Sequence, residues 1–199
     1  MSTDDAAGSR RRESPEFRRT QILDAAEDLL VERGLDASIA EIADAAGVAK
    51  GTVYLYFASR DDLLAALRAR YLERFVAAVG QSLARRPGAG PVDQVIRFAD
   101  ALFEWGVRHR QLHYVLFHEA GGSEDDALAC GTEMLTTIVV DGVSAGTVHV
   151  GDPELTARAL LDCIHGVFVA TIKIAEPDPD RYHRAVRELV PRILGTTLS

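Results

Sequence analysis

One stretch of the chain, residues 38–63 (SIAEIADAAGVAKGTVYLYFASRDDL), constrains the fold more than any other. Ser38 and Glu41 form an S-x-x-E pattern ahead of an apolar run, which is typical of the capping box that starts a helix. Gly47 follows this run, and glycine enters a left-handed turn without steric cost. The stretch therefore predicts two short helices separated by a tight turn, with a third helix beginning near its end.

The two short helices are expected over residues 38–45 and 49–56, in the arrangement of a helix–turn–helix, whose second helix enters the DNA major groove. One such helix contacts only a few base pairs, whereas two of them about one duplex turn apart read enough bases for specificity. The chain holds a single unit of this kind. We therefore expect a homodimer on a pseudo-palindromic operator in double-stranded DNA.

The candidates for DNA contact lie on or beside the second helix: Ser38, Lys50, Gly51, Thr52, Tyr54, Tyr56 and Arg60. Thr52 carries a methyl group and a hydroxyl, which suit a thymine methyl or a base edge, and Gly51 allows close approach of the backbone. The remaining side chains are expected to hold phosphates, which fixes the register without reading sequence. For the two tyrosines, packing at the helix junction is the alternative. Val53 and Phe57 should point inward.

The same stretch resembles the DNA-binding end of the tetracycline-repressor (TetR) family of bacterial transcriptional regulators. The resemblance runs from about Thr20 to Leu67 and rests on Ile22-Leu23-Asp24-Ala25-Ala26, Gly34, Ile42-Ala43, Ala46-Gly47-Val48, Lys50-Gly51-Thr52-Val53-Tyr54, Tyr56-Phe57 and Arg60-Asp61-Asp62-Leu63. Ala49 stands where the family usually has Ser, so the second helix lacks a side-chain cap. Arg60 replaces the usual Lys and keeps a cation. The resemblance implies a repressor that is released by a small-molecule effector.

The rest of the chain also reads as helical, so we predict an all-α fold of about nine helices. Ser-Pro or Asp-Pro pairs, which favour helix starts, stand at Ser14-Pro15, Asp152-Pro153 and Asp178-Pro179. Apolar spacing places further helices at about 59–83, 92–108, 112–119 and 125–144.

We expect three parts along the chain: a disordered basic arm (1–13), a helix–turn–helix DNA-binding domain (14–60) and a helical regulatory domain for effector binding and dimerisation (61–199). The net charge of −8 argues against unspecific coating of nucleic acid. Binding to phosphates depends on local cations, however, and arginines crowd the start of the chain. Arg10 to Arg12 form either a solvated tail or a DNA contact.

The effector is expected in an apolar pocket with a few polar groups, the usual form of a small-molecule site. The candidate lining residues are Phe98, Leu102, Trp105, His109, His113, Tyr114, Phe117, Met134, Ile138, His165 and Phe168. For each of them, ordinary core packing is the alternative. His109 and His113 stand four residues apart, but no third ligand has suitable spacing, so we expect no metal.

The last two predicted helices are apolar enough to pair with their symmetry mates in a four-helix bundle. The dimer residues expected there are Leu160, Ile164, Gly166, Val167, Tyr182, Val186, Leu189, Val190 and Ile193.

Several other classes of protein are disfavoured. The chain shows no Gly-rich phosphate loop and no nucleophile elbow, so we expect neither an enzyme nor a cofactor. Its first residues lack the apolar core of a signal peptide, and its longest apolar run is interrupted by charges, which favours a cytoplasmic protein away from membranes. Cys130 and Cys163 are expected to be buried and reduced. A ligand-independent architectural DNA-binding protein and an effector-dependent activator stay open as alternatives.

Overall fold

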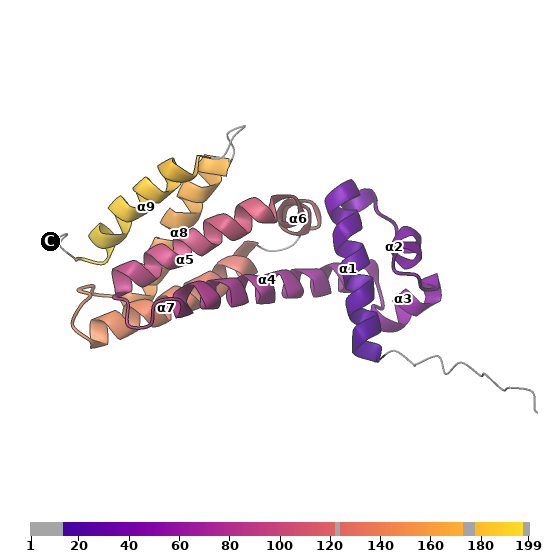
Figure 1. Cartoon of the computed structure of the whole chain (residues 1–199), viewed down its shortest axis with the longest axis horizontal. Coiled ribbons are helices and arrows are strands. Elements are labelled where there is room, and N and C mark those ends of the chain that lie inside the picture. The colour runs from indigo at the N-terminus through magenta and orange to yellow at the C-terminus, as the bar shows by residue number, and fades with distance from the viewer. Residues whose placement is uncertain (1–13, 122–123, 173–177, 197–199) are drawn as a thin grey trace, which may run out of the picture. The chain divides into compact units, whose positions relative to one another are not determined.

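The computed structural model describes residues 14–121, 124–172 and 178–196, and every regular element in that part of the chain is helical (Figure 1). The α-helices are α1 (Pro15–Arg33), α2 (Ile39–Ala45), α3 (Lys50–Tyr56), α4 (Arg60–Ala84), α5 (Pro91–Arg108), α6 (Arg110–Tyr114), α7 (Glu124–Ser144), α8 (Pro153–Ile172) and α9 (Pro179–Ile193). A 3₁₀ turn (Gly34–Asp36) follows α1 and a π-helical turn (Val115–Glu119) follows α6. The prediction of an all-α fold is confirmed. The arm expected at 1–13 lies outside the described residues.

The chain forms two compact units, one ending at Leu67 and the other beginning at Arg68. The division falls inside α4, so one continuous helix contributes to both units. The sequence predicts the domain boundary at 60, ahead of this helix. The structure instead assigns the first two turns of α4 to the first unit, and in these turns Leu63 and Leu67 are buried.

Local signals explain the first unit. Ser14 Oγ accepts the backbone N–H of Phe17 (3.1 Å) and Pro15 occupies the first helical position, so α1 starts as predicted. It ends at Gly34, whose φ of 61° suits glycine. Helices α2 and α3 follow, with α2 packed on both α1 and α3. Their shared interior is apolar and comprises Ile22, Leu23, Ala26, Leu30, Ile42, Ala43, Val53 and Phe57.

The second unit is a helical bundle in which α7 packs on α8, and α9 packs on both α8 and α5 (Figure 1). The completely buried Tyr182 of α9 donates its hydroxyl hydrogen to the backbone oxygen of Ala99 on α5 (2.9 Å). Burial raises the pKa of the Tyr182 phenol well above its usual value, so the group stays a neutral donor. This bond fixes α9 against α5 at the centre of the bundle.

The segment after α5 differs from its prediction as a single helix at 112–119. Helix α6 begins earlier, at Arg110, and gives way at Val115 to the wider π turn, in which the Ala120 N–H bonds to the Val115 oxygen (2.9 Å). Val115, Leu116 and Phe117 are all buried. One face of an α-helix does not present three consecutive side chains, and the wider turn brings them inward together.

None of the helices in the described part of the chain has the length and apolar character needed to cross a membrane.

Both cysteines are free, and their surroundings differ. Cys130 is half-buried, whereas Cys163 is exposed on α8. The prediction of burial is therefore wrong for Cys163, because it lies on the face of α8 opposite the core.

Candidate DNA-binding surface and effector pocket

The start of α2 is held by the predicted capping box. Ser38 Oγ accepts the backbone N–H of Glu41 (3.2 Å), and a Glu41 carboxylate oxygen accepts the backbone N–H of Ser38 (2.8 Å). Arg33 donates to the other carboxylate oxygen at 2.6 Å. The Ser38 backbone bond, helped by Arg33, holds the pKa of the Glu41 carboxyl below its usual value. Gly47, with φ of 64°, then forms the turn toward α3.

Helix α3 is anchored by its inner face. Val53 is completely buried and Phe57 nearly so, as predicted, and the Arg19 guanidinium lies over the Phe57 ring, 5.2 Å from its centroid. Ala49 gives the helix no side-chain cap. The two inward residues are four apart and share one face of the helix, so they fix the rotation of α3.

The opposite face of α3 is open to solvent. Gly51 is exposed there, and a Cβ added at Gly51 would meet nothing within 4 Å. Lys50 is exposed at the first position of the helix. Tyr54 is 46% and Leu55 is 83% exposed. Leu55 was not among the predicted DNA contacts, although its position two residues after Val53 already placed it outward. Thr52 and Tyr56 are four residues apart and are half-buried along one edge of this face.

Two predicted phosphate ligands have partners inside the protein. The Ser38 hydroxyl and backbone N–H both serve the capping box. The Arg60 guanidinium donates to the backbone oxygens of Ala37 (2.5 Å) and Leu35 (2.8 Å). Arg60 therefore ties the start of α4 to the loop before α2, which is a structural role that its position in the sequence did not reveal.

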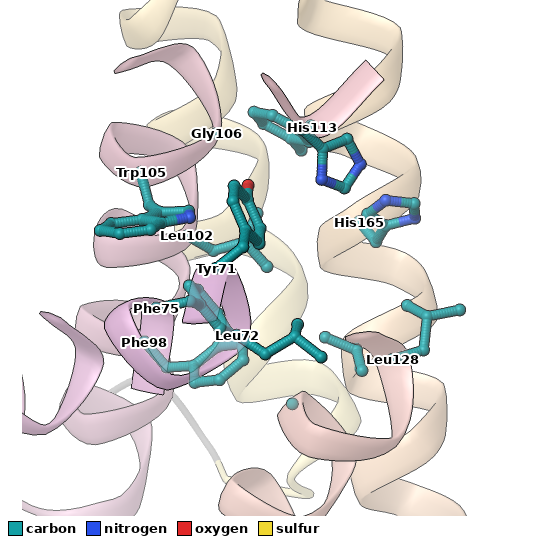
Figure 2. Close-up of a pocket in the computed structure, with 13 residues that line it drawn as sticks. Tyr71, Leu72, Phe75, Phe98, Leu102, Trp105, Gly106, His113, Leu128 and His165 are labelled. Atoms are coloured by element: carbon teal, nitrogen blue, oxygen red, sulfur yellow. The ribbon is translucent and has the colours of Figure 1, made fainter. Parts of the chain in front are cut away.

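The second unit contains an apolar cleft between four long helices and α6 (Figure 2). It is lined by Tyr71, Leu72 and Phe75 of α4, Phe98, Leu102, Trp105 and Gly106 of α5, His113 of α6, Leu128 and Gly131 of α7, and Leu161, His165 and Phe168 of α8. Its empty space is about 620 Å³, counting the part open to solvent. The aromatic rings of Phe75, Phe98, Trp105 and Phe168 crowd this space.

A few polar groups interrupt the apolar lining. In Figure 2, Tyr71 projects between Trp105 on one side and His113 and His165 on the other. The rings of Tyr71 and Trp105 meet edge to face, 5.5 Å apart between centroids. Trp105 Nε1 is buried near the Tyr71 hydroxyl and makes no hydrogen bond of good geometry. Burial, followed by the nearby imidazoles of His118 and His165, lowers the pKa of His113 to about 4. His113 is consequently neutral at physiological pH.

The structure brings six of the predicted pocket residues to this cleft, namely Phe98, Leu102, Trp105, His113, His165 and Phe168. The other five lie elsewhere. His109 stacks on Trp105, with centroids 3.8 Å apart, and Tyr114 is half exposed. Phe117 and Ile138 are buried, and Met134 packs against the core.

Helix α4 was missing from the predicted pocket. Tyr71 and Phe75 were visible as part of an apolar stripe on this helix, but the stripe does not say which cavity it faces. Two glycines were missed as well. A Cβ at Gly106 would lie 2.2 Å from Cζ of Phe168, and one at Gly131 would lie 3.1 Å from a Leu161 methyl. Both glycines thus bring α8 side chains close to the neighbouring helix backbone.

The predicted dimer residues divide into two groups. Leu160, Ile164, Tyr182, Val186 and Val190 are buried in the core of the single chain, and Val167, Leu189 and Ile193 are partly buried. Only Gly166 is exposed, with open space around its Cα. The apolar faces of α8 and α9 pack inside the helical bundle of the single chain. The five buried side chains are therefore not available at the surface of the protein.

A helix–turn–helix unit followed by a helical bundle defines a class of bacterial transcriptional regulators. The sequence pattern described as bacterial regulatory proteins of the tetR family matches residues 22–67. The chain is 31% identical over 141 residues to the HTH-type transcriptional activator FasR of Mycolicibacterium smegmatis, over 69% of this chain and 63% of FasR. It thus spans less than two thirds of that relative. The chain belongs to the TetR family, as its resemblance implied.

Solved structures support the same fold along most of the chain. A TetR-like transcriptional regulator from Rhodococcus sp. RHA1 superposes with a TM-score of 0.64 at 27% identity, covering 94% of this chain and 100% of the other. FadR of Bacillus subtilis, solved in complex with stearoyl-CoA, superposes with a TM-score of 0.69 at 22% identity, covering 86% and 96%. At that identity the second likeness concerns the fold alone.

Proposed function

We propose that the protein is a dimeric, sequence-specific DNA-binding regulator of transcription whose operator binding is changed by a small apolar effector. Family membership supports DNA binding by the first unit. The observation that carries the proposal is the open face of α3, because Gly51 and Leu55 lie opposite the buried Val53 and the cation of Lys50 is exposed at the start of the same helix. A face of this kind fits a major groove.

On this face we assign base reading to Gly51, Thr52 and Leu55, and phosphate contact to Lys50, Tyr54 and Tyr56. Leu55 is a large apolar side chain held in water, and contact with a thymine methyl would remove it from solvent. Lys50 and Tyr54 are exposed as well. Ser38 and Arg60 support this surface from within, through their hydrogen bonds to Glu41 and to the backbone before α2.

The effector site is the cleft of the second unit. It has the size and composition of a small-ligand site, since apolar side chains dominate and a few polar groups converge. The B. subtilis FadR neighbour was solved with stearoyl-CoA, which favours a ligand with an acyl chain. An architectural protein without a ligand would have no need for such a cleft.

The dimer is assigned to the exposed face of α8. Ala159, Cys163, Gly166 and Ala170 recur there at spacings of four, three and four residues and are all exposed. Small side chains allow a second helix to approach closely, and the edge of α9 at Leu189 lies half-buried. This set replaces the predicted residues that the core already uses.

The two functions are linked by α4, which carries Leu63 and Leu67 in the first unit and Tyr71 and Phe75 in the cleft. A ligand that binds more tightly to one position of α4 than to another shifts the population of molecules toward the position it prefers. The spacing between the two α3 helices of a dimer then matches the operator more closely or less closely.

The direction of control has two candidates. The family resemblance favours a repressor that the effector releases. The relative FasR is described as an activator, which favours the second candidate, an effector-dependent activator. The relatives are regulators and not enzymes, and we assign this chain no catalytic role, with the cytoplasm as its place of action.

The experiment that tests DNA binding is fluorescence anisotropy with duplexes from upstream of the gene and with random duplex, at several salt concentrations. We expect selective binding whose affinity falls as salt rises. Lys50→Ala should lower the slope of log K against log salt by about 1 for every phosphate that Lys50 neutralises in the wild-type complex. Equal binding to random duplex at every salt concentration would reject the operator-reading function.

A further inference from the structure

The buried N–H of Trp105 is the feature of the cleft that ordinary packing does not explain. Its Nε1 atom is shielded from water and has no acceptor at good hydrogen-bond distance and angle, although the indole lies near enough to the Tyr71 hydroxyl to oppose the rise in the pKa of that phenol. An indole nitrogen can only donate, and a buried donor without an acceptor destabilises a protein. The nitrogen edge of the ring is turned toward Tyr71 and the interior of the cleft (Figure 2). A ligand that offers an acceptor there would satisfy this donor.

The charges around the cleft restrict what that acceptor can be. Among its described lining residues, only Tyr71, His113 and His165 can ionise, and no Lys or Arg is present. His113 is neutral because its pKa is about 4. An anion moved into such surroundings loses its hydration without gaining a partner of opposite charge. The lining therefore favours an uncharged acceptor over a carboxylate.

The shape of the cleft adds a third restriction. Phe168 closes it against the α5 backbone at Gly106, and Phe75 and Phe98 lie edge to face with centroids 6.2 Å apart. The remaining space is bounded by side chains of α4, α5, α7 and α8. Because aromatic rings from α4, α5 and α8 crowd this space, an aliphatic chain or a single flat ring fits it better than a bulky polycyclic compound.

We propose that the cleft selects an uncharged, slender apolar ligand whose carbonyl oxygen accepts the hydrogen bond of Trp105 Nε1, and that it discriminates against the corresponding carboxylate. The inference rests on the proposed effector site and specifies its chemistry. Esters, ketones, lactones and acyl thioesters share this carbonyl. A thioester on a large polar carrier would keep the carrier outside the cleft.

The test uses four probes with the same eight-carbon chain: methyl octanoate, octanoyl-CoA, octanoate and 1-chlorooctane. Titration calorimetry at pH 7.5, above the ordinary imidazole pKa of about 6.5, gives their affinities for the full chain. Trp105 is the only tryptophan, so a change in its fluorescence reports occupancy of the cleft. We expect the ester, the thioester or both to bind at least about tenfold tighter than octanoate and 1-chlorooctane, the scale of one satisfied hydrogen bond.

Two variants separate the hydrogen bond from general packing. Trp105→Phe keeps an aromatic ring without the N–H, and it should abolish the advantage of the carbonyl probe over 1-chlorooctane. Phe98→Leu removes apolar contact from the same cleft and should weaken both probes by a similar factor. If Trp105→Phe fails to fold, the order of the four probe affinities in the wild-type protein still tests the inference.

Octanoate binding as tightly as the ester, or a carbonyl advantage retained in Trp105→Phe, would overturn the inference. None of these titrations contains DNA. The proposed regulatory function is tested separately, by operator binding. Its failure is therefore distinguishable from failure of this ligand assignment.

Discussion

Phe168 of α8 rests directly on the backbone of α5 at Gly106, where an added Cβ would lie 2.2 Å from its Cζ atom. No side chain other than hydrogen fits between the two, so Gly106 sets how closely α8 approaches α5. Phe168 also lines the cleft and packs edge to face on Phe103, with centroids 6.0 Å apart. The geometry of the cleft thus depends on a glycine.

The first prediction follows from this contact. Gly106→Ala should displace the Phe168 ring, lower the free energy of unfolding by about 1–3 kcal/mol through overpacking, and weaken ligand binding in the cleft. Thermal unfolding and calorimetric titration measure the two effects. Gly80→Ala is the matched control, because Gly80 is a helical glycine with open space around it. A Gly106→Ala protein with wild-type stability would show that the two helices are not closely packed at this point.

The second prediction concerns Gly51 and has opposite signs for stability and function. A Cβ there meets nothing in the protein, so Gly51→Ala should raise the stability of α3 by about 0.5–1 kcal/mol. The same methyl group would stand between the helix and the bases and should weaken operator binding by about tenfold or more. Denaturation and anisotropy test the two halves. Unchanged operator affinity would remove Gly51 from the DNA interface.

The first unit was largely predictable because its signals are local. The Ser38–Glu41 capping box, the Gly47 turn and the Ser14-Pro15 start each act within a few residues, and the structure contains all three. The partners of Arg60 are different in kind. They lie more than twenty residues earlier in the chain, so no local sequence pattern predicts them.

The second unit was predictable as helices but less so as a site. An apolar stripe such as that of Tyr71 and Phe75 packs equally well on a core, a cleft or a partner, and only the packing of the other helices decides. For the same reason Leu160 and Val190 were assigned to a dimer face, whereas they are buried in the chain's own core. Sequence periodicity gives the apolar face of a helix but not the surface that covers it.

The third prediction is a pH dependence caused by His113. Its folded-state pKa of about 4 lies below the ordinary imidazole value of about 6.5, so the unfolded chain binds more protons between these pH values. Stability should therefore fall as the pH is lowered, by about 1–2 kcal/mol from pH 7 to pH 5. His113→Gln should lose less stability than the wild type over this range. Substitution of the exposed His149 by Gln should leave the loss of stability as in the wild type. Identical losses in all three proteins would contradict this assignment.

The fourth prediction tests the dimer face. Gly166 is exposed and surrounded by open space, so Gly166→Arg should leave the fold intact while placing a long cation between the paired α8 helices. We expect a monomer by sedimentation and a loss of operator affinity of at least about a hundredfold, because one half-site alone binds weakly. Gly80→Arg, at an equally open helical position, is the control. A Gly166→Arg dimer of normal stability would place the interface elsewhere.

The central claim is that occupancy of the cleft changes operator binding, and one titration measures both. The operator duplex carries a fluorophore for anisotropy, and the single tryptophan, Trp105, reports the ligand in the same sample. We predict that the operator affinity changes at least about fivefold as Trp105 reports saturation, and that the DNA changes the ligand affinity by the same factor. A ligand that saturates the cleft while leaving the operator affinity unchanged would contradict the account.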